Sequence, residues 1–282
     1  GEGIGAAELL AASRRGRHAA SDHYEDAALA GVTTIGSRRC GGGLAGSAFD
    51  TTMDRAFALL DALPAELVIV EGSGSVIPPA RADATVCVVA ADQPLDYVAG
   101  YLGTYRLLIS DTIVLTMCEP PFADAGRVDS LRGAIAEVRP DLTVIPTVFR
   151  PRPLGDVAGR RVAYFTTAAE RSLELLTGHL RAAYGAEVVA ATASLASRPA
   201  LRDGLRRAAA ADVWLTEIKA AAVDVVAEAA AAAGKELLFC DNEPLAVRDG
   251  DLAGLAAWLA RLARRRFAGR LETVPPGAGE RS

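Results

Sequence analysis

The feature that most constrains this chain is the repeated alternation of short apolar runs with stretches of helical period. The apolar runs cover residues 32–36, 66–72, 85–91, 111–117 and 142–149. The helical patterns cover residues 6–15, 22–30, 50–63, 93–106 and 124–138. Because the runs are apolar at consecutive positions, they predict parallel strands that helices cover on both faces.

A second series of the same kind follows a break rich in proline and glycine at residues 150–160. Its apolar runs and helical patterns alternate over residues 160–168, 169–184, 186–195, 199–210, 211–219, 220–233, 235–244 and 251–268. We therefore expect two α/β domains, over residues 1–154 and 155–270. The second is typical of a small Rossmann-like domain, and residues 271–282 are expected to form a disordered tail.

Composition argues against several classes of protein. The net charge of −5 over 282 residues argues against a general nucleic-acid binder. No apolar run approaches the roughly 18 residues of a membrane helix, and no signal peptide opens the chain, so we expect a cytoplasmic protein. The four cysteines lack CxxC spacing, which argues against a disulfide scaffold or zinc site. The basic cluster Arg261–Arg270 predicts a solvated helix end or a site for an anionic partner.

The stretch "SRRCGGGLAG" joins two arginines to three consecutive glycines. A guanidinium group presents a fixed fork of donors to phosphate or carboxylate oxygens. Gly41, Gly42 and Gly43 lack a Cβ, so their backbone N–H groups can approach the same anion. We therefore predict an anion site at Arg38 and Arg39; the alternative is a flexible loop with solvated arginines.

A glutamate closes the apolar run in "ELVIVEGSGSVIPP". Glu71 stands at the carboxyl end of an expected strand, from which P-loop NTPases hold the Mg²⁺–phosphate assembly. Gly72, Ser73 and Gly74 follow, and their backbone N–H groups can face an anion. A tight turn with a capping glutamate explains the same residues equally well.

Other polar residues also follow apolar runs. Arg150 and Arg152, in "FRPRPL", are candidate anion ligands, although an ordinary domain linker explains them as well. Lys219 stands between an expected strand and an expected helix, as a phosphate ligand or as the start of a surface helix. The titratable residues of His18–Asp26 match no standard metal spacing, and helix capping from Ser21 explains much of their clustering.

The phosphate-binding motif GxxxxGK[ST] does not occur in these 282 residues. Gly234–Lys235 lies between a helix and a strand, whereas a phosphate loop lies between a strand and a helix. The chain also opens without a methionine, which points to a missing N-terminal part. We expect a nucleotide site that lacks its phosphate cradle.

Several long segments together resemble the cyclic 2,3-diphosphoglycerate synthetase family. They run in order from about residue 18 to 245 and comprise "HAASDHYEDAALAGVTTIGSRRCGGGLAG", "ELVIVEGSGSVIPPARAD", "YLGTYRLLISD", "VFRPRPLG", "LTEIKAAAVDVVAEAA" and "FCDNEP". The resemblance implies a ligase related to dethiobiotin synthetase, with a parallel sheet of the P-loop NTPase type that is incomplete at its N-terminus. Fuller members of the family carry a P-loop ahead of the region seen here.

The resemblance also implies an activity, in which ATP and Mg²⁺ drive closure of 2,3-diphosphoglycerate into a cyclic phosphoanhydride, with release of ADP and phosphate. Arg38 and Arg39 would hold phosphate groups together with the glycines beside them, and Glu71 would bind Mg²⁺. Arg150, Arg152 and Lys219 would be second-rank anion ligands, and Asp241, Asn242 and Glu243 would close the site from the C-terminal domain. The expected partner is a small phosphorylated substrate, with no nucleic acid and no membrane, and a homodimer is the one assembly considered.

Two other functions fit the same residues. One is an ATP-dependent carboxylate ligase of the dethiobiotin synthetase type, although the arginine–glycine loop favours a more highly charged substrate. The other is a non-enzymatic anion-binding or dimerisation module, which the missing phosphate loop favours.

Overall fold

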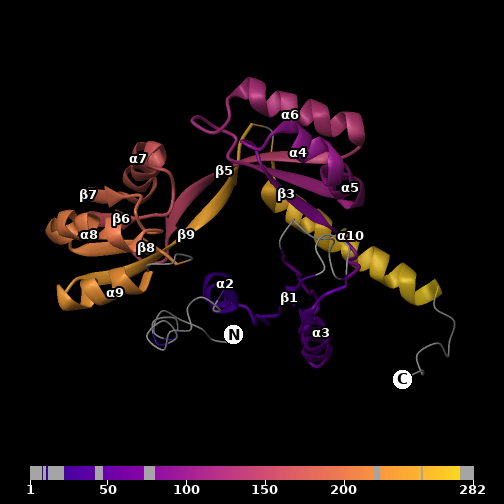
Figure 1. Cartoon of the computed structure of the whole chain (residues 1–282), viewed down its shortest axis with the longest axis horizontal. Coiled ribbons are helices and arrows are strands. Elements are labelled where there is room, and N and C mark those ends of the chain that lie inside the picture. Colours follow the sequence, from indigo (N-terminus) through magenta and orange to yellow (C-terminus); the bar gives the residue numbers. More distant parts are fainter. Residues whose placement is uncertain are drawn as a thin grey trace. The chain divides into compact units, whose positions relative to one another are not determined.

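The chain forms two compact α/β units (Figure 1). The computed structural model describes residues 8, 11, 22–41, 47–72, 80–218, 223–248 and 250–273. The first unit comprises residues 1–37 and 150–243, and the second comprises residues 38–149 and 244–282. The expected boundary near residue 155 placed residues 244–270 with the C-terminal domain, whereas in the structure they return to the second unit.

The second unit is built on three parallel strands in the order β3-β4-β5. Val86 of β3 faces Thr112 of β4, and Thr112 faces Thr143 of β5. Ile113 and Leu115 of β4 are fully buried in a core that helices α4, α5 and α6 help to form. The bounds are β3 (Val86–Ala90), β4 (Thr112–Thr116), β5 (Thr143–Pro153), α3 (Met53–Asp61), α4 (Leu95–Ala99), α5 (Tyr101–Ile109) and α6 (Ala125–Val138).

The last helix, α10 (Leu252–Thr273), belongs to the second unit. Its arginines pair with acidic side chains of that unit: Arg264 with Glu66 at 3.4 Å, Arg266 with Asp111 at 2.7 Å, and Arg270 with Asp83 at 2.8 Å. The basic cluster therefore binds the protein's own carboxylates, which neither of the two sequence-based interpretations foresaw. The expected tail is shortened, because the helix continues to Thr273; residues 274–282 lie outside the described part of the chain.

The first unit contains four parallel strands in the order β9-β8-β6-β7. From β6 the chain passes to β7 on one side and then returns to β8 on the other, as in doubly wound folds. This confirms the Rossmann-like architecture. The bounds are α2 (Asp22–Ala30), β6 (Arg161–Phe165), α7 (Leu173–Tyr184), β7 (Glu187–Thr192), α8 (Arg198–Arg207), β8 (Val213–Glu217), α9 (Val223–Ala232) and β9 (Glu236–Ala246), with short 3₁₀ turns η2 (Glu170–Ser172) and η3 (Ala208–Ala210).

Helices cover both faces of the sheet in the first unit. Alternate residues of β6 enter two separate cores: Ala163 and Phe165 pack in one, and Val162 and Tyr164 in the other. This follows from the period of two along a strand, and it explains why the runs are apolar at consecutive positions.

Strands β5 and β9 are longer than the sequence predicts. The N–H of Leu154 donates to the carbonyl of Phe239, and the N–H of Val247 donates to that of Pro146, so residue numbers rise along β5 while they fall along β9. The two strands are therefore antiparallel. The predicted linker at 150–160 is wrong for its first residues, because β5 continues through Arg150 and Arg152 to Pro153.

Two expected strands do not form. Residues 32–36 and 66–72 have no strand conformation, and the side chains of Leu67–Val70 are exposed. Apolar side chains alone do not make a strand, because a strand exists through its ladder with a neighbour. The expected helix at 6–15 falls almost entirely outside the described residues. None of the helices in the described parts of the chain has the length and apolarity that a bilayer crossing requires.

Candidate functional site

The predicted arginine–glycine site begins in a small hairpin of the second unit. Strands β1 (Arg39–Cys40) and β2 (Asp50–Thr51) pair antiparallel. Gly41 follows β1 with a φ of +79°, and a Cβ there would lie 2.8 Å from the Cβ of Phe49. The turn itself therefore requires glycine at position 41, whether or not an anion binds there.

The side chains of both arginines contact this hairpin. Arg38 Nη2 donates to Asp50 Oδ2 at 2.5 Å, and 67% of the Arg38 side chain is exposed. Arg39 Nη1 donates to the carbonyl of Gly41 at 3.4 Å. Since a guanidinium carries five N–H donors, the Asp50 ion pair leaves Arg38 able to bind a further anion.

Glu71 and Gly72 follow Leu67–Val70 in an exposed segment without regular secondary structure. A Cβ added at Gly72 would meet no atom within 4 Å, so packing against the described residues does not require glycine there. The remaining predicted residues of these loops, Gly42, Gly43, Ser73 and Gly74, lie outside the described residues, as do Lys219 and His18.

Arg152 of the first unit pairs with two of the acidic residues predicted to close the site. Its Nη2 donates to Asp241 Oδ2 at 2.9 Å, and its Nε lies 4.0 Å from Glu243 Oε2. The hydrogen bond to Asp241 raises the pKa of Arg152. The structure thus brings these three residues together, while Asn242 between the two carboxylates is exposed. Because Arg152 is paired, it is a weaker candidate for an added phosphate than the sequence indicates.

Arg150 acts on a neighbouring histidine of the same unit. Burial and the charge of Arg150 lower the pKa of His179, while the charge of Glu243 opposes them. Burial also raises the pKa of Tyr184, with Glu243 as the next cause. The predicted ligands of this unit therefore belong to one mixed-charge cluster (Arg150, Arg152, Asp241 and Glu243) and not to a purely basic pocket.

A buried glutamate at the carboxyl ends of β6 and β8 was not predicted. Glu217 is the last residue of β8 and is 3% exposed. Its Oε2 accepts hydrogen bonds from the N–H and the hydroxyl of Thr167, both at 2.7 Å, and its Oε1 accepts from Tyr164 and Thr166. The strand order reverses between β6 and β8, where ligands of open parallel sheets gather. Its sequence signal was the glutamate that ends the apolar run "VWLTE".

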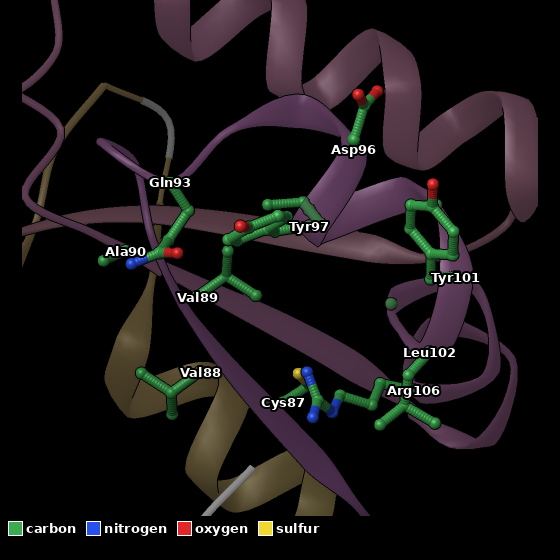
Figure 2. Close-up of a pocket in the computed structure, with 13 residues that line it drawn as sticks. Cys87, Val88, Val89, Ala90, Gln93, Asp96, Tyr97, Tyr101, Leu102 and Arg106 are labelled. Carbon is green, nitrogen blue, oxygen red and sulfur yellow. The ribbon is translucent and has the colours of Figure 1, made fainter. Parts of the chain in front are cut away.

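A cavity of about 470 Å³ lies beside β3 in the second unit. Residues of β3, α4 and α5 line it, and Figure 2 shows the guanidinium of Arg106 beside Cys87. Among the residues that the structure describes, the buried Nε of Arg106 finds no hydrogen-bond partner. Burial raises the pKa of Cys87, although the charge of Arg106 opposes this.

Two family models together match almost all of residues 3–243. The P-loop domain of cyclic 2,3-diphosphoglycerate synthetase matches residues 3–148, and the C-terminal domain of the same synthetase matches residues 153–243. The chain belongs to the cyclic 2,3-diphosphoglycerate synthetase family. The expected fold class, an α/β chain with a sheet of the P-loop type, is confirmed.

Relatives named cyclic 2,3-diphosphoglycerate synthetase agree with this membership. One from Rubrobacter xylanophilus is 51% identical over 95% of this chain and 59% of its own length. One from Methanothermobacter thermautotrophicus is 44% identical over 86% of this chain and 52% of its own length. One from Thermococcus gammatolerans is 46% identical over 84% of this chain and 53% of its own length. The chain thus spans somewhat over half the length of these synthetases.

The candidate residues of this synthetase-family chain fall in both units. The second unit holds Arg38, Arg39, Gly41, Glu71 and Gly72, and the first holds Arg150, Arg152, Asp241, Asn242 and Glu243. Within the described residues there is no group of three or more histidine, cysteine or carboxylate side chains that could hold a metal ion. Mg²⁺ needs only one or two protein carboxylates when phosphates complete its shell, so Glu71 alone remains compatible with the predicted role.

Proposed function

We propose that this chain forms part of an ATP-dependent ligase that closes 2,3-diphosphoglycerate into cyclic 2,3-diphosphoglycerate, with release of ADP and phosphate. Membership of the synthetase family carries this proposal. The arginines of the β1–β2 hairpin support it, with Arg38 exposed and Arg39 half-buried, because a substrate with two phosphates and a carboxylate needs cationic ligands.

The reaction divides into two displacements at phosphorus. A substrate phosphate oxygen first attacks the γ-phosphorus of ATP, and ADP leaves. An oxygen of the second substrate phosphate then attacks the phosphorus of the first, and the transferred group leaves as inorganic phosphate. Both steps bring anionic oxygens together, so the protein's main contribution is to position them and to neutralise charge.

Arg38 and Arg39 would bind the substrate phosphates from the hairpin. The ion pair with Asp50 fixes Arg38 against β2, which orients the rest of its guanidinium. Glu71 would hold Mg²⁺, which supplies charge neutralisation for the phosphates. The mixed-charge cluster of the first unit remains a second-rank candidate for the substrate's charged groups.

The experiment is a ³¹P NMR titration of the 282-residue chain with 2,3-diphosphoglycerate. We expect binding that the double variant Arg38→Gln/Arg39→Gln weakens at least about tenfold, because a hydrogen bond to a charged group contributes about 1.5–3 kcal/mol. The matched control is Arg206→Gln, which removes an exposed arginine that pairs with Asp203 of the first unit.

Equal weakening by the control would show that binding follows net charge and not the hairpin. Unchanged affinity in the double variant would remove both arginines from the site. If the chain binds a diamino carboxylic acid and not 2,3-diphosphoglycerate, the carboxylate ligase replaces the proposed function.

A further inference from the structure

Glu217 lies at the place where doubly wound sheets bind their ligands. It is the last residue of β8, and the strand order of the first unit reverses between β8 and β6. Phe165 of β6 lies beside Thr216 of β8, so Thr166 and Glu217 come next along the two strands. In doubly wound domains, the loop after such a strand presents donors to an anionic ligand. Here that loop, residues 166–169, joins β6 to the turn η2 and helix α7.

The donors of this loop turn toward the carboxylate of Glu217. Thr167 donates both its N–H and its hydroxyl to Oε2, each at 2.7 Å. Thr166 donates its hydroxyl to Oε1, and the hydroxyl of Tyr164 reaches the same oxygen at 3.3 Å. The oxygen of Thr166 also accepts the N–H of Ala168 at 3.0 Å, which leaves the hydroxyl proton of Thr166 for Glu217. Four donors thus converge on one carboxylate, as they would on a bound anion.

The period of the strands explains why this carboxylate is buried. Leu215 of β8 and Tyr164 of β6 pack in the core that α7 helps to form. Side chains two residues apart share a face of the sheet, so Glu217 and Thr166 continue these two rows at the carboxyl ends of the strands. Glu217 is 3% exposed and Thr166 is fully buried. The glutamate therefore points into the unit and not into solvent.

Hydroxyl and amide groups, and not a cation, hold this carboxylate. Among the described residues, the partners of Glu217 are three hydroxyls and one backbone N–H, and none of them is an arginine or a lysine. A buried carboxylate is costly unless hydrogen bonds replace its water. Since the loop after β6 supplies most of those bonds, the conformation of the loop and the burial of Glu217 depend on each other.

The loop also differs from one that receives the phosphates of a dinucleotide. In such loops, glycines allow the backbone to approach the pyrophosphate closely. Residues 166–169 read TTAA and contain no glycine. The loop is tied to the end of β7 as well, because the N–H of Thr166 donates to the carbonyl of Thr192 and the N–H of Leu195 donates to that of Thr166. It is therefore fixed from both neighbouring strands.

We propose that Glu217 is a built-in anion, whose carboxylate occupies the anion site of the β6–α7 loop and holds that loop in place. Glu217 is thus a positioning residue, and the chemistry of its site is that of a carboxylate receptor. Phosphates of a nucleotide or of a substrate are kept out of this point of the sheet. The mixed-charge cluster is then left as the candidate anion site of the first unit. The built-in anion does not depend on the proposed function.

The test replaces the built-in anion by a free one. Glu217→Ala removes Cγ and the carboxylate, and acetate has the same heavy atoms as that group. We expect the variant to melt below the parent chain, because buried donors lose their acceptor. Sodium acetate at about 0.1 M should raise its melting temperature at least about 3 °C above the value in equimolar sodium chloride, because acetate binds only the folded state.

The matched control is Leu215→Ala, two residues earlier on the same face of β8. Leu215 is fully buried, so its truncation also destabilises the first unit but leaves an apolar cavity. Acetate should raise the melting temperature of this control no more than it raises that of the parent chain. Glu217→Gln serves as a second variant, because its amide fills the site and acetate should not stabilise it further.

Hydrogen exchange reports on the loop itself. In Glu217→Ala, the amides of Thr167 and Ala168 should exchange at least about tenfold faster than in the parent chain, and acetate should slow them again. Because the loss of packing in Leu215→Ala would not respond to acetate, this reversal separates positioning of the loop from general stability. If Glu217→Ala folds only in acetate, that dependence supports the proposal equally.

Equal stabilisation of Glu217→Ala and Leu215→Ala by acetate would overturn the proposal. Slower exchange at residues 166–168 on addition of 2,3-diphosphoglycerate, ATP or inorganic phosphate to the parent chain would also overturn it, because the loop would then be an open ligand site. If acetate restores Glu217→Ala while the parent chain binds no 2,3-diphosphoglycerate, the proposed function fails and the built-in anion stands.

Discussion

Two apolar runs that end in a glutamate differ in secondary structure and in burial. "VWLTE", Val213–Glu217, forms β8, and all its side chains are buried. "LVIVE", Leu67–Glu71, forms no strand, and all its side chains are exposed. The sequences are alike in character, so the difference comes from what lies beside them.

Strand β8 has a parallel neighbour on each side, β6 and β9, and helices cover both of its faces. Its terminal Glu217 then accepts hydrogen bonds from the end of β6. The run 67–71 belongs to neither sheet. The comparison teaches that neighbouring strands, and not the apolar run itself, decide whether a run that ends in glutamate becomes a buried strand.

The largest expected effect on stability comes from replacing one apolar side chain of each run by alanine. Leu215→Ala should lower the free energy of unfolding by about 2–5 kcal/mol, because Leu215 is fully buried. Ile69→Ala should change it by less than about 0.5 kcal/mol in the free chain. Urea denaturation monitored by circular dichroism measures both, and a loss above about 2 kcal/mol for Ile69→Ala would contradict its exposure.

A smaller effect is expected from the two glutamates. Glu217→Gln should cost about 1–3 kcal/mol, because an amide nitrogen cannot accept the hydrogen bonds that Glu217 takes from Thr167 and Tyr164. Glu71→Gln should leave thermal stability unchanged. If both variants melt like the parent chain, the hydrogen bonds around Glu217 contribute nothing to folding.

The smallest expected effect is a difference in reactivity between two cysteine thiols, Cys240 next to Glu217 and Cys40 in the β1–β2 hairpin. Cys240 of β9 lies opposite Glu217 of β8 in the sheet. Burial raises the pKa of the Cys240 thiol, and the charge of Glu217 is the next largest cause. Cys40 at the hairpin is exposed. Because the thiolate is the reactive form, alkylation of Cys240 at pH 8 should be at least about tenfold slower than that of Cys40, and should accelerate as pH rises. Peptide mass spectrometry measures both rates; equal rates would contradict the burial of Cys240.

Periodicity was enough to predict several elements that pair or pack within the described part of the chain. The runs at 85–91, 111–117 and 142–149 became β3, β4 and β5, and the helix expected at 124–138 became α6. Pairing decided the rest, and pairing is not visible in a local pattern. The run at 66–72 failed for that reason, and "FRPRPL" became strand because its prolines alternate, which leaves one edge of β5 free to pair.

The candidate site was predicted less completely. Charge and glycine content located the β1–β2 hairpin, but not the ion pair of Arg38 with Asp50 twelve residues later. Arg152 was predicted to be an anion ligand, and Asp241 and Glu243 to close the site, but no sequence pattern showed that they bind one another. The role of each as a ligand stays a prediction.

The antiparallel register of β5 and β9 has a practical consequence for dissecting the protein. The bonds of Leu154 with Phe239 and of Val247 with Pro146 place Phe149 opposite Pro244. A gene truncated after Glu243, where the match to the C-terminal domain stops, would strip α10 from the second unit. Removing residues 150–243 and joining 149 to 244 through a short turn would instead keep both segments of the second unit, 38–149 and 244–282.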